Sequence, residues 1–127
     1  MIKVEDLRIG NWVNNYYTGA ESVSVGLLNM LEQFNPDLHQ QIYSGIPLTE
    51  DILLKCGFTK HGAKYTINNF DLYDFEYHAN GNDFKGWLVP LTDGDFFMSG
   101  KFVEIKYLHE LQNIYHVHKK QELNIKL

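Results

Sequence analysis

Cysteine, arginine and proline are scarce in this sequence of 127 residues. Cys56 is the single cysteine, so an intramolecular disulfide is excluded, and a lone thiol is typical of a protein kept in a reducing compartment. No apolar run approaches the roughly 20 residues that a membrane-spanning helix requires. The charged opening residues 1–6 also lack the apolar stretch of a secretory signal. The sequence therefore predicts a cytoplasmic protein with no membrane partner.

Positive charge is not gathered anywhere in the chain, and Arg8 is the only arginine. Proteins that grip the phosphate backbone of nucleic acids use clustered Lys and Arg side chains. The net charge is −5, and residues 65–100 hold six acids against the single base Lys85. These acids are Asp71, Asp74, Glu76, Asp83, Asp93 and Asp95. The balance disfavours nucleic acid as a direct partner.

Hydrophobic residues make up 44% of the chain and include 8 Tyr, 8 Phe and 2 Trp, which indicates a folded protein. A chain of this length buries about two-thirds of its unfolded surface. No internal repeat, low-complexity tract or linker divides it. We therefore expect a single domain over residues 1–127.

Residues 46–58 carry the clearest local signals. Thr49 is a good N-cap, and the two acids after it suit the positive end of a helix dipole. Gly57 can adopt the left-handed conformation after the last turn, which lets Phe58 fold back onto Leu53. The pattern predicts a short helix near residues 49–56.

Most of the remaining chain shows strand-like alternation broken by turn residues. Residues 12–17 and 22–28 predict two strands, while residues 29–40 are compatible with a short helix ending before Pro36. Asn68-Asn69, Asn80-Gly81 and Asp93-Gly94 separate further strand-like runs, as in an antiparallel meander. These runs are 64–67, 70–77, 84–89, 95–98 and 101–105, with a terminal strand at 123–127.

A longer amphipathic helix is expected near residues 105–119. Leu108, Leu111 and Tyr115 fall on its apolar side, and Gln112 and Asn113 fall on the side expected to face solvent. The fold class is therefore predicted as α+β: a mostly antiparallel sheet, barrel-like at the N-terminus in one version, with two helices.

Three segments together resemble a known family. They are Leu7-Arg8-Ile9-Gly10-Asn11, the run from Ile46 to Phe58 (IPLTEDILLKCGF), and the run from Tyr107 to Tyr115 (YLHELQNIY). They are similar to the "LRIGN", "IPLTE" and "LQN" elements of small uncharacterised proteins of gut anaerobes, their phages and mobile elements. The resemblance implies no activity, because the family has none established. This chain departs from the family where His116 to Lys120 extend the last helix.

Four features of the sequence are candidates for a catalytic or metal-binding site. His109-Glu110 begins like a zinc-protease HExxH helix, but Asn113 stands where the second His is needed. His116 and His118 point apart on a helix. Asp93-Gly94-Asp95 lacks the spacing of a calcium loop. Cys56 ends a capped apolar helix, which favours packing over catalysis. No catalytic residue, metal ligand or cofactor is therefore predicted.

The best candidate for a partner surface lies in the acidic third of the chain. Three adjacent apolar residues there must point to both faces of a strand, so one face needs cover from a helix, a second copy or another protein. The surface comprises Asp93, Asp95, Phe96, Phe97 and Met98. We expect a non-enzymatic accessory or protein-binding domain. The alternatives are a small enzyme using the acidic 71–95 region or the histidines, and, less favoured, a nucleic-acid-associated regulator.

Overall fold

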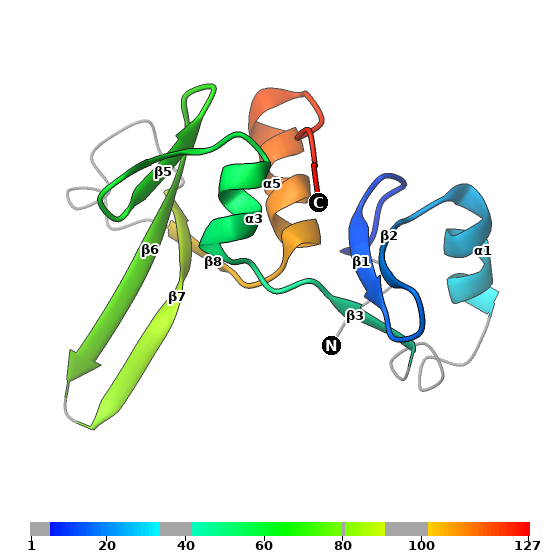
Figure 1. Ribbon diagram of the computed structural model, residues 1–127, viewed down its shortest axis with the longest axis horizontal. Helices are drawn as coiled ribbons and strands as arrows, with labels where there is room; N and C mark the ends of the chain where they lie inside the picture. Colours follow the sequence, from blue (N-terminus) through cyan, green and yellow to red (C-terminus); the bar gives the residue numbers. More distant parts are fainter. Residues whose placement is uncertain (1–5, 34–41, 80, 91–101) are drawn as a thin grey trace. The chain divides into compact units, whose positions relative to one another are not determined.

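The computed structural model describes residues 6–33, 42–79, 81–90 and 102–127. They contain three helices and eight strands in two antiparallel sheets, so the α+β class is confirmed (Figure 1). The chain forms two compact units. The N-terminal unit comprises Met1–Pro47 and Tyr107–Glu122, and the sheet unit comprises Leu48–Lys106 and Leu123–Leu127. The expectation of one domain over 1–127 stays a prediction.

The N-terminal unit is built on a small open sheet. Strands β1 (Trp12–Asn15), β2 (Gly19–Ser22) and β3 (Tyr43–Gly45) pair in the order β2-β1-β3. In the described residues β2 and β3 do not pair with one another, so this sheet is open and does not close into a barrel. The core beneath the sheet consists of buried apolar side chains: Leu7, Val13, Val23, Leu31 and Tyr43.

The strand predicted for residues 22–28 is wrong beyond Ser22. Helix α1 (Val25–Gln33) begins there instead, because Ser24 caps it: the Leu27 amide donates to Ser24 Oγ at 3.1 Å. Leu31 is its buried residue, which agrees with the short helix considered for this region, and residues 34–40 lie outside the described part.

The last helix, α5 (Leu108–Lys119), belongs to the N-terminal unit. It begins three residues later than predicted, because Ile105 closes a strand. The Tyr107 amide then donates to Glu110 Oε1 at 3.0 Å, which satisfies one of the free amides at the helix start. The helix ends at Lys120, whose φ of 54° is left-handed.

The sheet unit is a meander of five strands. They are β4 (Thr59–His61), β5 (Lys64–Ile67), β6 (Phe70–Ala79), β7 (Asn82–Pro90) and β8 (Phe102–Ile105), paired in chain order. Asn68 and Asn69 both have positive φ, the geometry of a tight hairpin turn. β6 and β7 run on as a two-stranded ribbon, because β5 pairs with β6 only up to Tyr73 and β8 pairs with β7 only from Trp87 (Figure 1).

Helix α3 (Glu50–Lys55) of this unit has both of the ends that the sequence predicts. Thr49 Oγ1 accepts from the Ile52 amide at 3.2 Å. Gly57 has a φ of 100°, and the Phe58 amide returns to the Leu53 carbonyl at 3.1 Å, as in a Schellman motif. The strand expected at 123–127 is absent, because these residues pair with no strand of the described sheet.

Candidate functional site

The residues of the "LRIGN" element and the last helix meet in one buried polar network. Gln112 is only 2% exposed. Its Oε1 accepts from the Trp12 amide at 2.8 Å, and its Nε2 donates to the Gly10 carbonyl at 3.0 Å. Both ends of the Gln112 amide therefore serve the backbone of the turn before β1. The expectation that Gln112 faces solvent is wrong, because this turn covers that side of the helix.

Asn113 closes the same network from the next position. Its Oδ1 accepts from Arg8 Nε at 2.8 Å and from Asn11 Nδ2 at 3.0 Å, while its Nδ2 donates to the Asp6 carbonyl at 2.7 Å. Arg8 also pairs with Glu122 at 2.8 Å, and this hydrogen bond lowers the pKa of the Glu122 carboxyl. These polar atoms are hydrogen-bonded to one another within the protein. The network therefore holds the turn to the helix and leaves few polar atoms that could bind a ligand.

The "IPLTE" element joins the same unit at its first two residues. The Leu108 amide donates to the Ile46 carbonyl at 2.8 Å, and Pro47 forms an isolated bridge with Tyr107. Gly45, just before it, packs so closely on the Tyr107 ring that an added Cβ would lie 2.6 Å from that ring. Residues of all three sequence elements thus have a structural role that accounts for their identity.

His109 is a buried polar side chain of the N-terminal unit with one ring nitrogen left without a hydrogen bond among the described residues. It is 4% exposed, and its Nδ1 has no hydrogen-bond partner among the described residues. Its ring stacks on Tyr107 at 5.8 Å between centroids. Burial lowers the pKa of the imidazole, so the neutral form is favoured.

The other described histidines and the cysteine do not assemble into a metal site. Among the described residues, no three His, Cys, Asp or Glu side chains gather as a metal site would require. His116 lies 3.7 Å from Glu122, and His118 is exposed rather than set among apolar residues as predicted. Cys56 is buried, and burial raises the pKa of its thiol, which opposes nucleophilic use.

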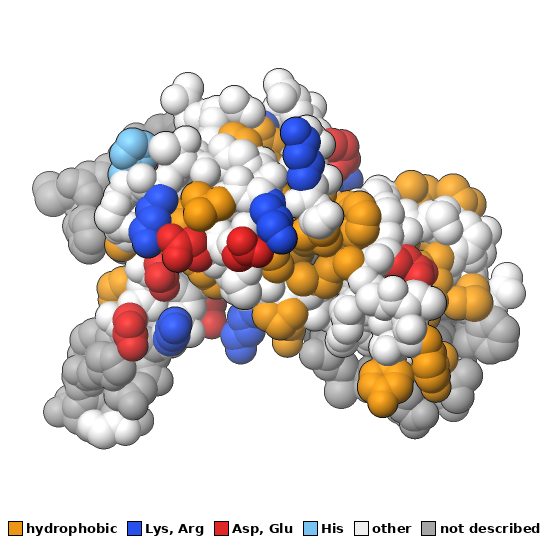
Figure 2. All heavy atoms as spheres, in the orientation of Figure 1, with side chains coloured by type: hydrophobic (Ala, Val, Ile, Leu, Met, Phe, Trp, Pro, Cys, Tyr) orange, Lys and Arg blue, Asp and Glu red, His pale blue; other side chains and the backbone are white. Residues whose placement is uncertain are grey.

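Two adjacent tyrosines stand out on the surface of the N-terminal unit. Tyr16 and Tyr17 occupy the turn between β1 and β2 and are 76% and 77% exposed. Their rings meet edge to face, with centroids 5.2 Å apart. Figure 2 shows hydrophobic side chains exposed over this hairpin. Alternation along a strand predicts opposite directions for the two rings, but both residues lie in the turn and point outward.

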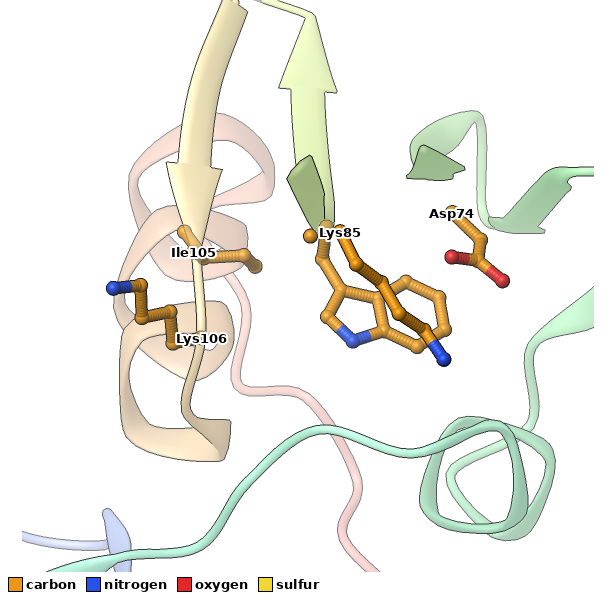
Figure 3. A pocket seen from close by; sticks show the side chains of 6 residues that line it. Asp74, Lys85, Ile105 and Lys106 are labelled. Carbon is orange, nitrogen blue, oxygen red and sulfur yellow. The ribbon is translucent and has the colours of Figure 1, made fainter. Parts of the chain in front are cut away.

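The sheet unit carries a surface hollow of about 260 Å³. It is lined by Asp74, Lys85, Gly86, Trp87, Ile105 and Lys106, which come from β6, β7 and the end of β8. Figure 3 shows Asp74 and Lys85 on one side of the hollow, Ile105 on the other, and the Lys106 amine directed away from them. Of the described acids in residues 65–100, Asp74 is the one that lines the hollow.

The predicted partner surface lies outside the described residues. This applies to Asp93, Asp95, Phe96, Phe97 and Met98, and the surface stays a prediction. Within the described ranges, no helix is long and apolar enough to cross a membrane. No family model, curated protein or solved structure matches the chain.

Proposed function

We propose that this protein is a non-enzymatic, protein-binding accessory domain, and that its contact surface includes the Tyr16-Tyr17 turn. The observation that carries the proposal is the high exposure of two adjacent aromatic rings, Tyr16 and Tyr17, at 76% and 77%. Tyrosine is enriched at protein interfaces, since it offers a large rigid surface with a polar tip and few rotatable bonds.

The turn that presents the two rings is fixed by hydrogen bonds from both tyrosine amides. The Tyr16 amide donates to the Ile42 carbonyl at 2.8 Å, and the Tyr17 amide donates to Asn15 Oδ1 at 2.9 Å. The second bond is an Asx turn, a local device that rigidifies a bend. A fixed turn lowers the entropy cost of binding, which favours recognition over a passive loop.

The use of the other polar side chains supports a binding role over the small-enzyme alternative. In the N-terminal unit, Arg8, Gln112 and Asn113 are committed to the fold. Nucleic acid remains disfavoured, since the single arginine is paired with Glu122. The resemblance of the three sequence elements supports a phage or mobile-element origin, and the buried unpaired thiol of Cys56 supports a cytoplasmic location.

The test is a quantitative pull-down from lysate of the organism that encodes the protein. Wild type is compared with Tyr16→Ser plus Tyr17→Ser and with Val117→Ser, whose side chain is 71% exposed on α5 of the same unit. We expect a partner that wild type and Val117→Ser capture and the double variant loses, with all three showing the same melting temperature. Equal capture by all three, or no captured partner, would contradict the proposal. Sedimentation of the purified proteins shows whether that partner is a second copy.

A further inference from the structure

The hollow of the sheet unit has one rigid aromatic wall. Trp87 donates from its indole Nε1 to the Leu48 carbonyl at 3.2 Å, and Tyr65 meets the indole edge to face at 5.4 Å. A ring held from two directions is pre-organised for stacking and loses little entropy when a ligand packs on it. Ile105, the cross-strand neighbour of Trp87 on β8, also lines the hollow but is 3% exposed, so Trp87 offers most of the apolar surface.

Two opposite charges flank this apolar surface without neutralising one another. Asp74 lies directly across from Trp87, and Lys85 precedes Trp87 by two residues, so all three share one face of the sheet. In the described part of the chain, neither Asp74 nor Lys85 forms an ion pair. Their positions are diagonal, and diagonal neighbours in an antiparallel pair start about 7–8 Å apart. That gap suits a small group hydrogen-bonded to both.

We propose that the hollow binds a free α-amino acid with an aromatic or branched aliphatic side chain. The ligand ammonium donates to the Asp74 carboxylate, the ligand carboxylate accepts from the Lys85 ammonium, and the side chain packs on Trp87 and Ile105. A zwitterion matches the Asp74 carboxylate and the Lys85 ammonium beside an apolar wall, because each ligand charge meets its opposite. The inference is independent of the Tyr16-Tyr17 surface.

The binding test uses L-phenylalanine and the full chain labelled with ¹⁵N. The Trp87 indole resonance and the β7 amides should shift saturably, with a Kd on the order of 1 mM for so small a ligand in an open hollow. Asp74→Asn and Lys85→Gln should each weaken binding by about two- to fivefold, the scale of a solvent-accessible charge pair. Phenethylamine and 3-phenylpropionate, which each lack one ligand charge, should bind about fivefold more weakly than L-phenylalanine.

Matched controls come from the opposite face of the same sheet. Asp71→Asn on β6 and Lys64→Gln on β5 remove the same charges without touching the hollow and should leave the Kd unchanged. The amide spectra of all variants report whether they are folded. Three results would overturn the proposal: no saturable shift up to about 10 mM, binding to Asp74→Asn as tight as to wild type, or 3-phenylpropionate binding as tightly as L-phenylalanine.

Discussion

The N-terminal unit buries Asn11, His109 and Gln112, whereas the fully buried side chains of the described sheet unit are apolar or aromatic. The first unit depends on amide side chains that close hydrogen bonds between residues about 100 positions apart in sequence. The second depends on hairpin ladders between consecutive strands and on an apolar core. A sequence element that looks like a candidate chemical site can therefore serve a structural hydrogen-bond network instead. We therefore expect different kinds of substitution to destabilise the two units.

The largest effect is expected from a cavity in the sheet unit. Leu53 of α3 has no exposed surface, so Leu53→Ala should lower the free energy of unfolding by about 2–5 kcal/mol. Leu54→Ala is the matched control, because the neighbouring side chain is 47% exposed and should cost less than about 0.5 kcal/mol. Urea unfolding followed by circular dichroism measures both. Equal losses would mean that α3 does not pack on this core.

A polar-to-apolar change should do the comparable damage in the N-terminal unit. Gln112→Leu keeps the approximate volume but leaves the Trp12 amide and the Gly10 carbonyl without their partner. We expect a loss of about 1–3 kcal/mol, the cost of leaving a partly buried polar group without its hydrogen bond. Gln121→Ala, at an exposed position, is the control and should be near neutral. If Gln112→Leu leaves the free energy of unfolding unchanged, the hydrogen-bond network does not stabilise the unit.

Local residue chemistry, where the partners are close in sequence, made parts of both units predictable. Thr49 and Gly57 end α3 as expected because a cap acts within four residues. Ser24 gives the same kind of local signal for α1, and it outweighs the strand alternation that continues through Val25. The burial of Gln112 could not be foreseen, because its partners in the turn before β1 lie about 100 residues away. The hollow could not be predicted from the sequence either, because the register of β6 and β7 is what places Asp74 beside Trp87.

A more local effect separates two glycines of the N-terminal unit. Gly45→Ala should destabilise by about 1–3 kcal/mol, because the new Cβ would lie 2.6 Å from the Tyr107 ring. Gly26→Ala in α1 meets nothing closer than 4.0 Å and should stabilise by up to about 1 kcal/mol, since alanine favours the helix. The same substitution therefore has opposite signs. Differential scanning fluorimetry measures the change in melting temperature of each variant. Changes of the same sign would contradict the packing of Tyr107 on Gly45.

The pH dependence of stability is expected to show the contribution of His109. Burial lowers the pKa of His109 in the folded state, while the unfolded side chain titrates near its ordinary value of about 6.5. As the pH falls below that value, His109 binds a proton in the unfolded chain but stays neutral in the folded chain. This contribution to stability is therefore lost on acidification, until the folded imidazole is protonated too. His109→Phe should show a shallower fall in melting temperature from about pH 7 to about pH 5; an identical fall would refute this role.

The most direct measurement is a double-mutant cycle between the two asparagines that join the "LRIGN" turn to α5. Asn11 Nδ2 donates to Asn113 Oδ1 at 3.0 Å, so Asn11→Ala, Asn113→Ala and the double variant isolate that bond. If these amides hold the unit together, urea unfolding should give a coupling free energy on the order of 1 kcal/mol. Additivity within about 0.3 kcal/mol would contradict the structural role assigned to these residues and would leave them free for chemistry.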